Sequence, residues 1–74
     1  MAARYTYSPM VPQRAGKYAV RWRQRNHGKA VVTPSEHPSG FTAEITTKAG
    51  DRLGLYDVVY ATDCMGVEWC FLVE

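Results

Sequence analysis

The sequence predicts an all-β domain built as a small meander of five antiparallel strands. The chain has 74 residues, which is enough for one small hydrophobic core and not for a second domain. Glycine recurs every 12 to 14 residues, at positions 16, 28, 40, 54 and 66, as is expected of turns between short strands. The segments between these glycines alternate apolar and polar residues, which is the period of a strand with one buried face.

The first predicted hairpin joins strands at residues 17–25 and 29–33. In the first strand Tyr18, Val20 and Trp22 fall on one face, and a lysine and three arginines fall on the other. Residues 26–28, which end in a glycine, are the expected turn. Pro34 is expected to end the return strand, because proline cannot donate a hydrogen bond to a strand ladder.

The remaining strands are predicted at residues 41–48, 53–62 and 67–73. A loop rich in proline and serine, residues 33–40, precedes the first of them. The last two are expected to pair as a long hairpin across the turn at 63–66, with a glycine bulge. Both strands of this hairpin are apolar on both faces, so both faces should be covered. No helix is expected there; the alternative is a mixed fold with a short N-terminal helix.

This outline resembles SH3-like barrels in size and strand spacing. The resemblance implies that the five-stranded antiparallel meander curls into a small barrel or a strongly bent sheet. Residues 17–74 would form the single β domain, preceded by an irregular arm, residues 1–16, of which 4–7 could add a short edge strand. The expected core consists of Tyr18, Val20, Trp22, Val31, Phe41, Ile45, Val59, Trp69, Phe71 and Val73.

Charge is distributed unevenly along the chain and points to a polyanion-binding surface. Residues 1–37 contain seven basic residues and one acidic residue, and residues 38–74 contain two basic and six acidic ones. A row of like charges on one face of a strand suits phosphate binding, since paired opposite charges would be interspersed. We therefore expect a cationic hairpin that binds nucleic acid or an acidic protein surface through Lys17, Arg21, Arg23, Arg25, His27 and Lys29. Exposed aromatic contacts are expected from Tyr5, Tyr7 and Tyr56.

The alternative is a small accessory or inhibitor protein that binds another protein. The apolar surplus of the predicted C-terminal hairpin would then meet a protein partner or a second copy of the chain. Its interface candidates are Val58, Tyr60 and Leu72.

Other classes of function find no support in the sequence. No Cys-x-x-Cys pair, Gly-rich phosphate loop or catalytic dyad with supporting neighbours occurs, so we expect no enzyme, metal site, cofactor or small-molecule substrate. No apolar run exceeds five residues, so no membrane span is expected. The N-terminus lacks the apolar segment of a signal peptide, and two cysteines make no disulfide scaffold. We therefore expect free thiols at Cys64 and Cys70 and a cytoplasmic location.

Overall fold

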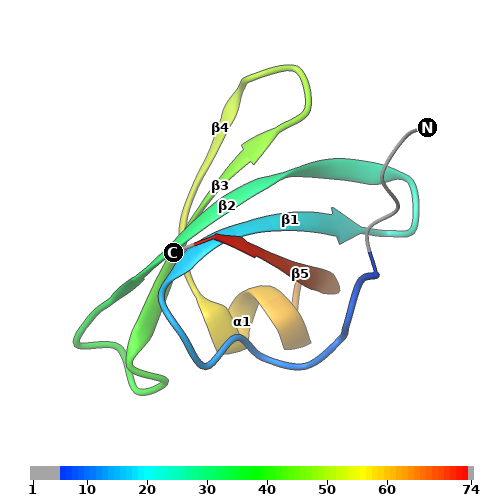
Figure 1. The fold of residues 1–74 in the computed structure, drawn as a ribbon. Coiled ribbons are helices and arrows are strands. Elements are labelled where there is room, and N and C mark those ends of the chain that lie inside the picture. The colour runs from blue at the N-terminus through cyan, green and yellow to red at the C-terminus, as the bar shows by residue number, and fades with distance from the viewer. Residues whose placement is uncertain (1–5, 74) are drawn as a thin grey trace.

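The computed structural model describes residues 6–73 and confirms the five-stranded antiparallel meander. The sheet order is β4-β3-β2-β1-β5, and every neighbouring pair is antiparallel. The sheet does not close into a barrel; it bends over one short helix (Figure 1). The elements are β1 (Gly16–Trp22), β2 (Asn26–Pro34), β3 (Phe41–Thr47), β4 (Arg52–Asp57), α1 (Val58–Asp63) and β5 (Val67–Val73). In the part of the chain so described, no helix is long and apolar enough to cross a membrane.

The first hairpin turns earlier than the sequence predicts. β1 ends at Trp22, which pairs with Asn26, so the turn comprises residues 23–25 rather than 26–28. Arg23 and Gln24 adopt φ angles of 54° and 62°, the left-handed conformation that a tight turn requires and that glycine normally supplies. The strand therefore ends at Trp22, three residues before the last arginine of the alternating run, Arg25.

Gly28 lies inside β2, opposite Val20, for a reason other than turning. A Cβ atom at this position would lie 2.2 Å from the carbonyl oxygen of Thr46 on β3. Glycine thus permits a close approach of two backbones, which is a common role of glycine in a strand interior. The predicted turn at this glycine was wrong for that reason.

A helix replaces the second half of the strand predicted at 53–62. Asp57 caps it: its Oδ2 accepts hydrogen bonds from the backbone N–H groups of Val59 and Tyr60, at 3.1 and 3.4 Å. The Ser39 hydroxyl donates to Oδ1 of the same carboxylate. This hydrogen bond, followed by those from the helix N–H groups, lowers the pKa of Asp57. The cap therefore stays ionised, and stabilises the fold, until the pH falls below the ordinary carboxyl range.

The helix also changes the pairing of the last strand. α1 carries the chain across the inner face of the sheet, so β5 pairs with β1 and not with β4 (Figure 1). The predicted C-terminal hairpin is therefore wrong, and its two segments lie at opposite edges of the sheet. The indole N–H of Trp69 donates to the Thr62 hydroxyl at 2.8 Å and ties β5 to α1.

The core lies between the inner face of the sheet and α1. The predicted core residues Tyr18, Val20, Ile45 and Trp69 are buried, and Trp22 and Phe41 pack against them half-buried. The core also contains residues that were not predicted: Ala30, Val32, Ala43, Val58, Ala61 and Val67.

Three predicted core residues are partly exposed instead. Val31 is 42% exposed because the β1–β2 register places it opposite Lys17, on the outer face. Val59 is 38% exposed because the helix turns its neighbour Val58 inward. Phe71 is 37% exposed and carries the Arg14 guanidinium over its ring, 4.1 Å from the centroid. The side chain of Val73 lies outside the described residues.

The N-terminal arm reaches the free edge of β5. Ser8 and Trp69 exchange two backbone hydrogen bonds of 2.8 Å, which form an isolated bridge. Residues 6 and 7 form no strand, and positions 1–5, where the rest of the predicted edge strand would lie, are outside the described residues. Cys64, at the end of α1, and Cys70, in β5, are free cysteines, as predicted.

Candidate nucleic-acid interface

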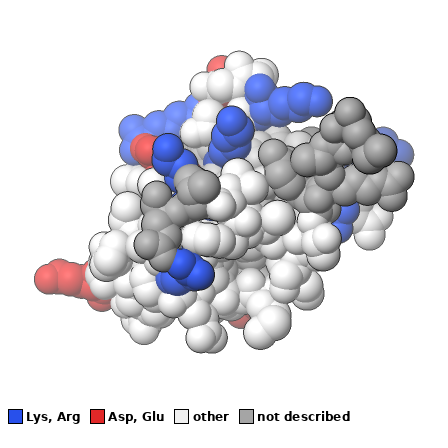
Figure 2. All heavy atoms as spheres, in the orientation of Figure 1, with Lys and Arg blue, Asp and Glu red and all other residues white. Residues whose placement is uncertain are grey.

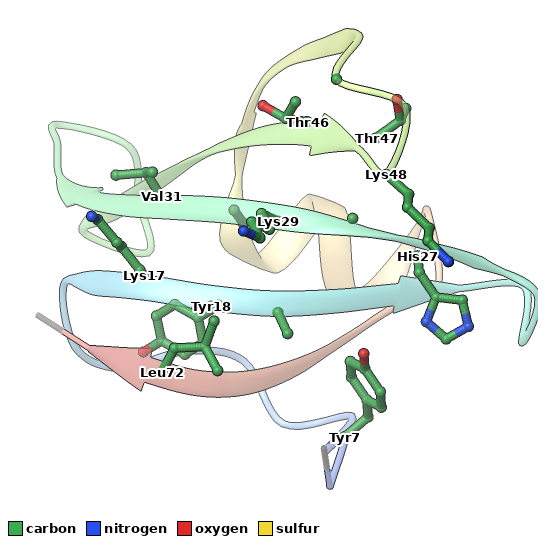
Figure 3. Close-up of a pocket in the computed structure, with 14 residues that line it drawn as sticks. Tyr7, Lys17, Tyr18, His27, Lys29, Val31, Thr46, Thr47, Lys48 and Leu72 are labelled. Carbon is green, nitrogen blue, oxygen red and sulfur yellow. The ribbon is translucent and has the colours of Figure 1, made fainter. Parts of the chain in front are cut away.

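The face of the sheet opposite α1 contains a groove of about 950 Å³. It runs over β5, β1, β2 and the end of β3 (Figure 3). We call it the outer groove; the side chains that matter below are Lys17, Ala19, Lys29, Val31, Lys48 and Leu72. Tyr7 and His27 line one end of it.

The three lysines of the outer groove lie on a diagonal across the sheet. Ala19 pairs with Lys29, so Lys29 is the diagonal neighbour of Lys17, and Lys29 in turn pairs with Thr46. Lys48 follows Thr46 by two residues and completes the diagonal. Diagonal neighbours are separated by about 7–8 Å, so the three Cα atoms span roughly 15 Å. Figure 3 shows the lysines following one another from β1 to β2 and to the turn after β3.

A second diagonal runs beside the lysines and carries two apolar side chains followed by the ring of a histidine. Cys70 pairs with Ala19, which makes Leu72 the diagonal neighbour of Ala19 on β5. On the other side, His27 is the diagonal neighbour of Ala19 on β2. Ala19 is 4% exposed, so its small side chain forms the floor between the larger residues at either end. The outer groove thus has a cationic line and an apolar line in parallel.

Arg21 lies on the same face of the sheet as the groove and contacts two side chains near one end of it. Its Nη2 lies 2.8 Å from Oε1 of Glu68 on β5, and its guanidinium lies over the ring of Tyr7, 4.7 Å from the centroid. The Tyr7 ring meets the His27 ring edge-on at 6.0 Å. The ion pair depends on the pairing of β1 with β5, which was not predicted. Arg21 therefore orders the aromatic end of the groove.

The predicted cationic set is divided by the structure. Lys17, His27 and Lys29 come together in the outer groove. Arg23 and Arg25 lie in the exposed turn between β1 and β2, beyond the groove. Arg23 lines a separate shallow hollow near Met65.

Lys48 was missed by sequence reasoning, and Tyr7 was anticipated only as an exposed aromatic residue. The backbone N–H of Lys48 donates to the carbonyl oxygen of His27 at 3.0 Å, which holds the β3–β4 turn beside β2. In the sequence Lys48 only ends an alternating strand, so the signal would have been the register of β2 with β3. Of the other two aromatic candidates, Tyr56 stacks on Tyr60 with centroids 6.2 Å apart, and Tyr5 lies outside the described residues.

The formal charges that line the outer groove are all positive. Of the residues between 6 and 73, three lysines line it, and no aspartate or glutamate does. Two glutamates near it on the same face are neutralised by arginines: Glu68 by Arg21, and Glu44 by Arg52 at 2.9 Å. Figure 2 shows Lys and Arg side chains gathered over the upper part of the molecule, with few acidic atoms among them.

The three predicted protein-interface residues do not share a surface. Val58 is fully buried under the sheet, so its prediction as an interface residue is wrong. Tyr60 is 51% exposed on α1, on the inner side, and Leu72 lines the outer groove. The helix separates them because it turns residues of the predicted strand to a different face.

Metal binding finds no support within positions 6–73, where no three His, Cys, Asp or Glu side chains form a group able to hold an ion.

No protein-family model matches the chain, and comparisons with curated proteins and with solved structures find no match either. The outer groove is therefore interpreted from its own chemistry.

Proposed function

We propose that the protein is a binding module, not an enzyme, and that it holds nucleic acid in the outer groove. The observation that carries this proposal is the diagonal of Lys17, Lys29 and Lys48 in a groove lined by no carboxylate among the described residues. Within that part of the chain, none of the three lysines forms an ion pair. Their ammonium groups are available to phosphates at regular intervals.

A phosphate backbone suits this groove better than an isolated anion does. The lysines are spread over roughly 15 Å, a distance that calls for a ligand with repeated negative charges. Backbone phosphates supply such charges, and binding to them releases counterions. Thr46 and Thr47, which also line the groove, add hydroxyl groups that can donate to phosphate oxygens. Arg23 and Arg25 extend the positive surface at the hairpin tip.

The competing proposal is contact with a protein, and one observation favours it. Leu55 on the edge strand β4 is 58% exposed, and Tyr60 on α1 is 51% exposed. A second copy of the chain could pair along this edge, since β4 has a strand neighbour on one side only in the described sheet. Binding of nucleic acid by a monomer would set this alternative aside.

Free thiols at Cys64 and Cys70 suit a reducing compartment, and we propose the cytoplasm.

A salt titration tests the proposed function. We expect a fluorescent oligonucleotide of mixed sequence to bind the protein, with affinity falling as salt rises from about 50 to 200 mM. Three backbone contacts predict a log–log slope of about −2 on a single strand. The solution mass, measured in the same buffer without oligonucleotide, should be that of one 8.3 kDa chain. The absence of binding at the lowest salt would contradict the proposal, and a stable dimer would favour the competing one.

A further inference from the structure

We infer that the outer groove takes single-stranded nucleic acid in preference to a duplex. This inference rests on the proposed function and specifies its substrate class. Its basis is the pair of parallel lines in the groove, one cationic and one apolar with rings at its end.

The cationic line offers a site for one phosphate row. Lys17, Lys29 and Lys48 follow a single diagonal, and a single strand has a single row of phosphates. A duplex presents two rows on either side of a groove and exposes only the edges of its bases there, because the faces of the bases are stacked on one another. Only an unpaired strand can place its phosphates on the lysines and the faces of its bases beside them.

The apolar line offers a surface for those bases. Leu72 and Ala19 form an apolar floor next to the lysines, and Val31 adds an apolar side chain that is 42% exposed. Ala19 is already buried, so the apolar surface that a base can cover is that of Leu72, which is half-buried, and of Val31. Water leaves these two side chains when a base covers them, and that burial is favourable only for a ligand with an accessible apolar face. A ligand bound only through its phosphates would leave these apolar side chains hydrated. The floor therefore distinguishes a single strand from any ligand that presents phosphate only.

The ring of His27 completes the base site. His27 is exposed at the end of the apolar line, and the edge-on Tyr7 ring, itself held under Arg21, fixes its position. Proteins that bind single strands without sequence preference use such rings as stacking platforms beside a basic groove. Tyr7 and Arg21 act as positioning residues, and His27 is the ring that contacts the base.

Competition between matched ligands tests the inference. The ligands are a 12-nucleotide oligothymidylate, an oligouridylate of the same length and a blunt 12-base-pair DNA duplex. We expect either single strand to bind at least tenfold more tightly than the duplex at equal salt. Duplex binding of equal or greater affinity would overturn the inference and leave the proposed function intact. Failure of all three ligands to bind at low salt would overturn the proposed function itself.

Two substitutions at one position test the role of the ring. We expect His27→Ala to weaken oligothymidylate binding by about tenfold, since it removes the ring on which a base stacks, without a change in salt slope. His27→Phe should restore the affinity, because the ring is retained and no charge is supplied. Equal affinity of all three proteins would contradict base stacking at this position. Loss of affinity in both variants would also contradict it, because it would show that the imidazole acts by charge or hydrogen bonding.

Discussion

Replacement of Lys17, Lys29 and Lys48 by glutamine is expected to weaken oligonucleotide binding about a hundredfold. Each of the three lies in the outer groove and forms no ion pair within the described chain. An exposed charge pair contributes up to about 1 kcal/mol, and three such pairs with phosphate correspond to about two powers of ten in affinity. The log–log salt slope should become shallower by about 2, at about 0.7 for each lysine replaced. Fluorescence anisotropy at several salt concentrations measures both quantities.

A charge-matched pair of variants separates the groove from a general effect of net charge. Lys29→Gln and Arg14→Gln each remove one positive charge, and the guanidinium of Arg14 lies over Phe71 and does not line the groove. We expect Lys29→Gln to weaken binding severalfold and Arg14→Gln to leave it nearly unchanged. Equal effects of the two variants would show that the protein binds through its overall charge and not through the outer groove.

Introduction of a carboxylate at Val58 is expected to unfold the domain. Val58 is fully buried, and Val58→Asp places an unpaired carboxylate in the core at a cost of several kcal/mol. A domain of this size has a total stability of roughly 4–11 kcal/mol, at about 0.05–0.15 kcal/mol per residue. Circular dichroism and a thermal melt should show lost structure or a greatly lowered Tm.

The neighbouring residue provides the control. Val59→Asp introduces the same carboxylate one position later, at a side chain that is 38% exposed. Both positions lie in the first turn of α1, where an acidic residue is favourable toward the helix dipole, so helix propensity cannot explain a difference. We expect Val59→Asp to fold with a Tm close to that of the parent. A folded Val58→Asp protein would contradict the burial of Val58 in the helix and favour the strand that the sequence predicts at this position.

The fold class was predictable because two segments alternate without ambiguity. Residues 17–22 and 41–47 carry the period of a half-buried strand, and both are strands in the structure. The helix was not predictable from periodicity, because residues 58–61 form a short apolar run that fits a buried strand and a helix equally well. The valines in this run favour a strand by propensity. Capping by Asp57 and burial of Val58 and Ala61 decide in favour of the helix. The cap is local, but the burial of the two side chains and the hydrogen bond from Ser39 to the cap depend on tertiary contacts.

The candidate site was predictable only in part. Lys17 and Lys29 share a face because of strand alternation, which the sequence displays. Two other features depend on which strands are neighbours: Lys48 joins them through the β2–β3 register, and Arg21 meets Glu68 through the pairing of β1 with β5. Strand order is a property of long-range packing, so a row of basic residues in the sequence could not show which of them would be paired.

The most direct test of the proposed interface is a chemical-shift map of the ¹⁵N-labelled protein titrated with oligothymidylate. We predict the largest shifts at the backbone amides of Ala19, Lys29 and Lys48, on three neighbouring elements of the outer groove. The amide of Leu55, at the far edge of the sheet, and that of Tyr60, on the opposite side, should keep their chemical shifts. Shifts that gather on β4 and α1 and leave the outer groove unchanged would contradict the proposed interface.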